Sequence, residues 1–344
     1  MRLSELGEFG LLARLIAQVG ARPAAPGEIM GPGDDAAVLD LSPGERLVAT
    51  TDILLEEVHF SRKWFAPRDI GWKAAVANIS DIAAMGASPR WLLVGLALPA
   101  DVTVEAAEEV QAGFLDVGRQ YGATLVGGDI SASRSGLVVA GLALGVVSGE
   151  PLLRSGARPG DALAVTGALG GSGAGLAVLR AGGPVSEQEE QLAERHLRPR
   201  ARVEEGLALR QSGLVHAMLD VSDGVAADAL RLAEASGVRA VIEAARVPLA
   251  EGAKASAERL GCDVNEWGLS GGEDYELLLA TGPDAVDGLS EMLARLGCSL
   301  TVIGRCEAGE GVCISGHERS IRGGFDHFAP DNSPEAGSHG VDAQ

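Results

Sequence analysis

Cysteine is scarce in this chain of 344 residues, and none occurs before position 262. The four cysteines, Cys262, Cys298, Cys306 and Cys313, show no C-x-x-C spacing, which disfavours a zinc site. We therefore expect reduced thiols, either buried or at the surface, in a cytosolic protein.

Basic residues are also few. The chain has 28 Lys and Arg residues against 48 Asp and Glu residues, which gives a formal net charge of −20. Binding to nucleic acid or to an anionic membrane depends on clustered basic side chains, so we expect neither partner. An anionic substrate would have to be held by metal ions or by a few local arginines.

A long apolar segment is missing as well. The longest uncharged run, residues 135–149, is too short to span a membrane and is interrupted by glycines. We interpret it as a buried strand. The N-terminus carries Arg2, Glu5 and Glu8 without an apolar stretch beside them, so we expect no signal peptide.

What the chain does contain is the composition of a soluble, turn-rich α/β protein. Its residues are 46% hydrophobic and include 48 glycines. A chain of this length usually folds as two domains. We place the boundary near Pro151, which gives domains over 1–150 and 151–328. Residues 329–344 are polar and contain several Pro and Gly residues, so we expect a disordered tail.

Helical and strand-like apolar patterns alternate along most of the chain. Spacings of three and four residues predict helices over 6–16, 70–85 and 104–121, with further helices starting near 174 and 226. Apolar runs next to turn residues predict strands over 36–39, 46–55, 91–98, 124–126, 137–147, 162–166 and 214–219. The helix over 70–85 is largely apolar on all sides, so we expect it to be buried.

A short acidic turn, residues 31–38, is the stretch around which the sequence is organised. Asp34 and Asp35 stand together between glycines and the start of a strand. Adjacent carboxylates repel each other, and a hard cation such as Mg²⁺ relieves that repulsion. Taken alone, this turn is better explained as a solvated acidic surface.

The same arrangement recurs at four other places, where aspartates stand beside small or hydroxyl residues at the end of an apolar run. These are Thr50-Thr51-Asp52, Ser80-Asp81, Gly127-Gly128-Asp129 and Asp220-Val221-Ser222-Asp223-Gly224. Such oxygen atoms are what a site for several Mg²⁺ ions and a phosphate requires. A structural cap or salt bridge remains open for Asp81, and capping of the next helix remains open for Ser222 and Asp223.

Three further segments carry weaker signals. His59 follows a strand in an expected loop, where a plain surface histidine is an open alternative. The segment 270–277 joins a glycine turn to an expected strand whose first residues are acidic, and solvated carboxylates remain open there. The glycine-rich loop 167–175 precedes a helix and could bind an anion, but it matches neither the P-loop nor the dinucleotide pattern.

In their order and spacing, these motifs resemble those of the thiamine-monophosphate kinases, in the superfamily that includes aminoimidazole ribonucleotide synthetase. The similarity covers roughly residues 3–328. It also includes the segments Val58-His59-Phe60, 78–86, 154–157, 270–277 and 324–328. The resemblance implies an α/β (α+β) fold of two aminoimidazole ribonucleotide synthetase-like domains, with mixed sheets flanked by helices.

The activity that the resemblance implies is ATP-dependent phosphorylation of thiamine monophosphate to thiamine diphosphate. It implies a cytoplasmic homodimer that pairs its N-terminal sheets and holds the nucleotide in a cleft near the domain junction. The implied ligands of several Mg²⁺ ions are Asp35, Thr50, Thr51, Asp52, Asp81, Asp129, Asp220 and Asp223. The implied contacts to ATP are Gly128, Arg154 and Ser222, and those to the thiamine substrate are His59, Glu273 and Phe325.

Two departures from the family pattern stand next to these residues. Glu57 occupies a position that is usually glycine, which bears on the conformation of the His59 loop. Ile130 and Ser131 follow Asp129 where two threonines are common, so we expect one hydroxyl contact to a phosphate to be missing.

The chemistry explains why no nucleophile and base are needed. A phosphate oxygen would attack another phosphate, and its second pKa of about 6 leaves it mostly deprotonated near neutral pH. The obstacle is repulsion, about 4 kcal/mol per pair of unit charges 4 Å apart at an effective dielectric constant of 20. Bridging Mg²⁺ ions remove it. The alternatives are a superfamily enzyme with another acceptor and a non-catalytic thiamine-phosphate-binding protein.

Overall fold

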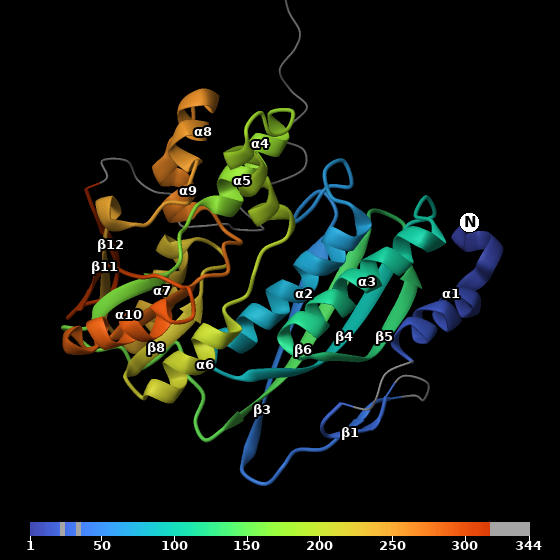
Figure 1. Cartoon of the computed structure of the whole chain (residues 1–344), viewed down its shortest axis with the longest axis horizontal. Coiled ribbons are helices and arrows are strands. Elements are labelled where there is room, and N and C mark those ends of the chain that lie inside the picture. Colours follow the sequence, from blue (N-terminus) through green and yellow to red (C-terminus); the bar gives the residue numbers. More distant parts are fainter. Residues whose placement is uncertain (21–24, 32–35, 317–344) are drawn as a thin grey trace, which may run out of the picture.

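The computed structural model describes residues 1–20, 25–31 and 36–316. They form a four-stranded, a six-stranded and a small two-stranded sheet, and helices pack against the two larger sheets (Figure 1). Both larger sheets mix parallel and antiparallel neighbours, which confirms the predicted fold class. Asp35, Phe325 and the expected tail over 329–344 lie outside the described residues. No helix among those described is long and apolar enough to cross a bilayer.

The N-terminal half is built around the four-stranded sheet, with strand order β3-β6-β4-β5. Its strands are β3 (Glu45–Leu55), β4 (Ser88–Leu98), β5 (Thr124–Ala132) and β6 (Val138–Ser148). Its helices are α1 (Leu3–Val19), α2 (Pro67–Ala84) and α3 (Val104–Tyr121). Helices α2 and α3 cover one face of the sheet, and α1 packs against α3 at the edge of the molecule (Figure 1).

Helix α2 is buried around almost its whole circumference, as its apolar pattern predicts. The helix begins with Pro67, whose fixed φ suits the first turn. The chain leaves it through Gly86, at a φ of +63° that favours glycine. The buried amide of Asn78 is satisfied, because it donates to the Ala74 oxygen and accepts from the Asp52 nitrogen.

The other face of this sheet is only partly covered. The hairpin of β1 (Glu28–Met30) and β2 (Val38–Leu39) pairs antiparallel, and Leu39 packs beside the buried Trp91 on that face. Farther along β3, three large apolar side chains of the same face are exposed: Leu47, Ile53 and Leu55. The sheet thus keeps an apolar surface opposite its helices.

The C-terminal half is built around the six-stranded sheet, with strand order β12-β9-β11-β7-β10-β8. Its strands are β7 (Ala162–Thr166), β8 (Val215–Asp220), β9 (Arg239–Glu243), β10 (Leu277–Thr281), β11 (Leu300–Glu307) and β12 (Gly311–Ser315). Its α-helices are α4 (Gly171–Arg180), α5 (Glu187–Leu197), α6 (Val203–Ser212), α7 (Val225–Ser236), α8 (Ala253–Leu260), α9 (Val264–Ser270) and α10 (Val286–Ala294). Two short 3-10 turns are η1 (Ala244–Arg246) and η2 (Pro283–Ala285).

Helix α2 also forms the junction between the two halves, since it contacts β8, α5 and α6. The Trp72 indole N–H donates to the Pro199 oxygen at 2.9 Å. Asp69, in the first turn of α2, pairs with Arg198 at 2.5 Å. The sheets therefore meet across a helix that belongs to the core of the first half.

Two predicted strand boundaries next to the site residues are wrong. Strand β5 continues through Gly128 and Asp129, where we expected it to end at Val126. Glycine permits this continuation, because a Cβ on Gly128 would lie 2.3 Å from the Val94 oxygen of β4. Strand β10 begins at Leu277, after the acidic residues that we expected to open it, because the backbone before it takes positive φ values.

The predicted start of α4 is also wrong, since the helix begins at Gly171 rather than near Ala174. The Asp274 carboxylate accepts from the nitrogens of Gly170, at 2.6 Å, and Ser172, at 3.0 Å. A cap supplied from a distant segment thus extends the helix into a glycine-rich loop that sequence signals would exclude.

All four cysteines carry free thiols, as expected for reduced side chains. Cys298 and Cys306 are buried, whereas Cys262 and Cys313 are exposed.

Candidate active site

Three carboxylates from three different elements gather where the two halves meet. Asp52 lies in β3, Asp81 on α2 and Asp220 at the end of β8. Burial, followed by the charges of Asp81 and Asp223, raises the pKa of Asp52 to about 6. Burial and then Asp81 raise the pKa of Asp220 well above its ordinary value. These mutual effects show that three of the predicted Mg²⁺ ligands lie close together.

Each of two carboxylates in this cluster is oriented by one hydroxyl group. The Thr50 hydroxyl donates to Oδ2 of Asp81 at 2.5 Å, and the Ser80 hydroxyl donates to Oδ2 of Asp220 at 2.6 Å. Burial still raises the pKa of Asp81, although Thr50 and the positive charge of Arg154 oppose the rise. Arg154 therefore faces the cluster from the exposed segment that links the two halves.

A fourth predicted ligand, Asp223, borders the cluster on the C-terminal side. Its carboxylate pairs with Arg231, which also binds Asp228 at 2.7 Å. The Asp228 carboxylate accepts from the backbone nitrogens of Ser222 and Asp223 at 3.1 Å. Helix α7 begins after Gly224 and has no side-chain cap, so capping does not account for Ser222 or Asp223.

Three predicted residues of the first sheet do not join the three carboxylates. Side chains alternate along β3, so Thr51 projects from the face opposite Asp52, and its hydroxyl donates to the Gly141 oxygen at 2.7 Å. Gly128 lies in the same cross-strand row as Asp52, but on β5, with β6 and β4 between the two residues. Asp129 is exposed in the next row, on the face of Thr51. The roles assigned to Thr51, Gly128 and Asp129 stay predictions.

The segment before β10 lies against the loop after β8. Nitrogen atoms of Glu273 and Tyr275 donate to the oxygens of Ser222, at 2.8 Å, and Val221, at 2.9 Å. Both donors have a positive φ, 64° and 52°. Their side chains point toward the N-terminal half, because Glu273 pairs with Lys73 of α2 and Tyr275 packs in the core of that half. This backbone pairing brings the predicted ATP contact Ser222 next to the predicted substrate contact Glu273.

Tyr275 is a site residue that sequence analysis missed. Its ring is 6% exposed and packs in the hydrophobic core of the N-terminal half. Burial raises the pKa of its hydroxyl, and the charges of Glu273 and then Asp52 raise it further. The phenol thus borders the acidic cluster. A tyrosine among acidic residues was visible in the sequence, but the side to which it points was not.

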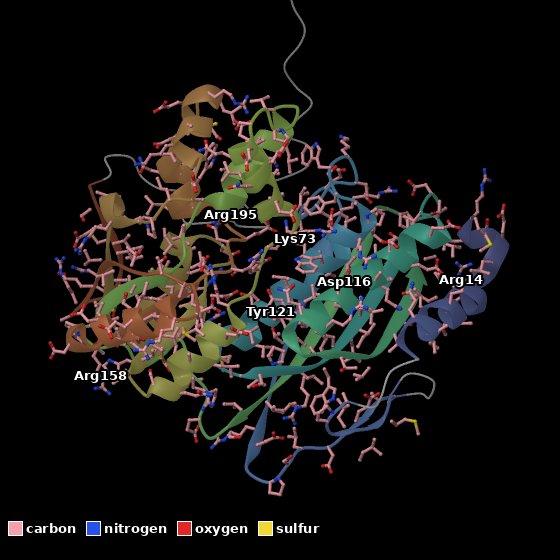
Figure 2. All side chains as sticks on the ribbon, viewed as in Figure 1. Arg14, Lys73, Asp116, Tyr121, Arg158 and Arg195 are labelled. Carbon is pink, nitrogen blue, oxygen red and sulfur yellow. The ribbon has the colours of Figure 1, made fainter. Side chains whose placement is uncertain are left out.

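Lys73 is a second missed residue. Its side chain is fully buried on α2, and its ammonium donates to the His59 oxygen at 2.9 Å and to Oε2 of Glu273 at 2.8 Å. Figure 2 labels Lys73 on the part of α2 near α5, which carries Arg195. The His59 ring turns back on its own loop, since Nδ1 accepts from the Leu55 nitrogen at 3.0 Å. The sequence signal that could have identified Lys73 is a single lysine within a largely apolar helix.

His196 lies beside this ion pair without forming a catalytic triad. Its Nδ1 is 3.0 Å from the Ser172 hydroxyl and 3.5 Å from Oε2 of Glu273. A Ser-His-acid triad uses both ring nitrogens, whereas both contacts here involve one. Ser172 is also 1% exposed, and burial followed by the charge of Lys73 holds the pKa of His196 well below its usual value. The arrangement therefore supports no nucleophilic serine.

The two acidic residues on the other side of this segment are structural. Asp274 caps α4, as described above. Glu276 is buried, accepts from Thr166 at 2.7 Å and pairs with Arg202 through both oxygens at 2.6 and 2.7 Å. Within residues 273–276, Glu273 and Tyr275 thus face the site, whereas Asp274 and Glu276 anchor the fold.

The donor set of the cluster fits Mg²⁺. Over the described ranges, none of the buried Asp220 and the half-buried Asp52 and Asp81 forms an ion pair, so their charges lack a basic partner within 4 Å. In the same ranges, no three His, Cys, Asp or Glu side chains are assembled closely enough to hold a metal by themselves. Mg²⁺ is ordinarily held by one or two carboxylates together with waters and substrate phosphates, which agrees with both findings.

Comparisons with known proteins cover both halves. The family models for AIR synthase related protein match residues 33–147 with the N-terminal domain and residues 158–315 with the C-terminal domain. The chain is 36% identical to the thiamine-monophosphate kinase of Aquifex aeolicus (strain VF5), over 95% of this chain and 100% of that one. The crystal structure of thiamine-monophosphate kinase from Stenotrophomonas maltophilia K279a shares 36% identity and a TM-score of 0.79, over 91% of this chain and 98% of that one. The structure of AaThiL complexed with AMPPCP and TMP shares 35% identity and a TM-score of 0.75, over 95% of this chain and 99% of that one.

Proposed function

The chain belongs to the thiamine-monophosphate kinase family, and from this premise we propose that it transfers the terminal phosphoryl group of ATP to thiamine monophosphate, giving ADP and thiamine diphosphate. The observation that carries the proposal is the cluster of Asp52, Asp81 and Asp220, half-buried or buried between the two halves. A similar protein, AaThiL, has been solved with AMPPCP and TMP bound. ATP is therefore the co-substrate.

The transfer is direct and in line. The acceptor phosphate is already ionised near neutral pH, so no side chain has to remove a proton from it. The Ser172–His196 contact does not offer a covalent route, for the geometric reason given above. What the chain must supply is orientation of two anionic substrates and compensation of their charge.

Asp52, Asp81 and Asp220, with Thr50 and Asp223 beside them, would hold Mg²⁺. Bound there, Mg²⁺ would neutralise the phosphates of both substrates and bring them together. The remaining predicted ligands, Asp35, Thr51 and Asp129, belong to the same proposal as outer members of the set. The hydroxyls of Thr50 and Ser80 bond to two of these carboxylates and would keep them oriented for holding the ions.

The substrates divide between the two sides of the cluster. Arg154, which faces Asp81, would clamp the triphosphate, with Gly128 and Ser222 as further nucleotide contacts. Glu273, His59 and Phe325 would meet the thiamine moiety. The contact between Glu273 and Ser222 supports this assignment, because it places a proposed thiamine contact next to a proposed nucleotide contact. The acceptor could then approach the nucleotide from the C-terminal side.

We further propose a cytoplasmic homodimer. The exposed apolar residues of β3, Leu47, Ile53 and Leu55, offer a surface that a second copy could cover. Asp129 and Thr51 project from the same face, so pairing of sheets would place these two predicted ligands at the subunit interface. Light scattering coupled to gel filtration tests this directly, and a monomer at micromolar concentration would reject the dimer.

A coupled assay for ADP release tests the function. We expect ADP to form only when ATP, Mg²⁺ and thiamine monophosphate are all present, and thiamine diphosphate to appear in equal amount. Binding of thiamine monophosphate without ADP release would instead identify a thiamine-phosphate sensor. No binding, with ADP release on another phosphorylated acceptor, would identify a different enzyme of the superfamily.

A further inference from the structure

A fully buried lysine connects two segments that the proposed function places against the acceptor substrate. The Lys73 ammonium bonds to the backbone oxygen of His59 and to the Glu273 carboxylate. The same nitrogen lies 5.2 Å from the centre of the Phe65 ring, which fills the space beside it. Lys73 thus occupies the meeting point of α2, the turn over 56–60 and the segment after α9.

The two segments that Lys73 joins hold the unusual backbone of the molecule. Within residues 1–20, 25–31 and 36–316, the non-glycine residues with positive φ are Glu57, Glu273 and Tyr275, at 64°, 64° and 52°. Left-handed conformations are costly for such residues and persist where the surroundings enforce them, most often at functional sites. The positive φ of Glu57 also explains why glycine is usual at this position, since glycine adopts that conformation readily.

The contacts of Glu273 show how the lysine controls its carboxylate. Oε2 is held by Lys73, while 24% of the side chain stays exposed. His196, 3.5 Å away, is a neutral neighbour rather than a competing cation. Without the lysine, the carboxylate would lose its ion-pair partner and could turn toward solvent or toward other groups.

We propose that Lys73 is a positioning residue for the acceptor substrate. It fixes the Glu273 carboxylate, and with it the His59 turn, in the geometry that binds the thiamine moiety, and it touches no reacting atom. This inference rests on the proposed function, because that function gives Glu273 and His59 their ligand. A purely structural ion pair would stabilise the fold without any preference between the two substrates.

Steady-state kinetics of Lys73→Met separates these roles. Methionine keeps the apolar stem and removes the ammonium. We expect the KM for thiamine monophosphate to rise roughly 10- to 100-fold, the loss expected when a binding group is displaced by about 1 Å. The KM for ATP should change less than about twofold. The matched control is Lys63→Met, because Lys63 is exposed in the neighbouring turn, and both constants should stay at wild-type values.

A second variant keeps the test decisive if Lys73→Met folds poorly. In Lys73→Met/Glu273→Gln neither partner is charged, so no unpaired buried charge opposes folding. If Lys73 acts through Glu273, the double variant will have the same KM for thiamine monophosphate as Glu273→Gln alone. A further rise over Glu273→Gln, or equal rises in the KM for both substrates, would overturn the proposal. A wild-type protein that fails to phosphorylate thiamine monophosphate would reject the proposed function instead, so the two failures are distinguishable.

Discussion

The Ser80 hydroxyl donates a 2.6 Å hydrogen bond to Asp220, and this bond joins α2 of the N-terminal half to the last residue of β8 in the C-terminal half. Both side chains are buried. The bond opposes the rise in the Asp220 pKa that burial and Asp81 cause. One proposed Mg²⁺ ligand is therefore oriented by the half of the chain to which it does not belong.

Ser80→Ala should weaken both stability and metal activation. The substitution leaves a buried carboxylate oxygen without its donor, and we expect the free energy of unfolding in urea to fall by about 1–3 kcal/mol. The Mg²⁺ concentration for half-maximal activity should rise, because Asp220 becomes harder to ionise. Ser135→Ala is the matched control, since Ser135 is exposed in the turn before β6. An unchanged Mg²⁺ requirement would show that Asp220 is not a ligand of the metal.

Asp52→Asn and Asp220→Asn should each abolish transfer while leaving the fold intact. An amide keeps the shape of the side chain but removes the charge that holds Mg²⁺, so we expect kcat to fall about 10³-fold or more. The metal-free variants should melt at the same temperature as the wild type or higher, because repulsion within the cluster decreases.

Activity at saturating Mg²⁺ and circular dichroism measure these two effects. Asp287→Asn, at an exposed position on α10, should behave as the wild type in both. Near wild-type turnover of either cluster variant would show that the metal assignment is wrong.

Asp274 should make the metal-free protein less stable as the pH rises. Burial raises its pKa to about 7, although hydrogen bonds from Ser172 and Gly170 oppose the rise. Its pKa in the unfolded chain is about 3.9, so the folded state binds the extra proton between these values. The contribution of Asp274 to stability is therefore fully present below about pH 4 and is lost as the pH rises to about 7.

Urea unfolding of wild type and Asp274→Asn at pH 5 and pH 8 measures this effect. The free energy of unfolding of the wild type should fall by about 2–3 kcal/mol more than that of the variant. Comparison with the variant cancels similar contributions from Asp52 and Asp220. A wild type that gained stability relative to the variant at pH 8 would contradict the assignment.

Phe325→Ala should affect thiamine monophosphate rather than ATP. Phe325 lies outside the described residues, and its place at the substrate follows from the family resemblance. Stacking of an aromatic ring with a cation contributes about 0.5–2 kcal/mol, so the KM for thiamine monophosphate should rise roughly threefold to thirtyfold. Varying each substrate in turn measures both constants. A larger effect on ATP would reverse the proposed division of the site.

The sequence allowed the elements of the site to be placed, because hydrophobic periodicity and turn residues are local signals. Strand β3, helix α2 and strand β8 lie within one to three residues of their predicted bounds. They bring Asp52, Asp81 and Asp220 together. The faces of a strand were also predictable in principle, since neighbouring residues such as Thr50 and Thr51 must point in opposite directions.

Partners that are distant in sequence could not be predicted. Lys73 and Glu273 are separated by 200 positions, and no local pattern shows that they meet. The left-handed backbone at Glu273 and Tyr275 is enforced by contacts with the loop after β8, so propensity favoured a strand there instead. Long-range packing decided these features, and they are the ones that shape the substrate side of the site.

The position of α2 has a consequence for how the two halves move. Trp72, Lys73 and Ser80 bond to the C-terminal half, while Asn78 and Asp81 bond to β3 of the first half. A hinge rotation between the two halves would have to break several of these bonds at once. We therefore expect the two halves to move as one rigid body during turnover.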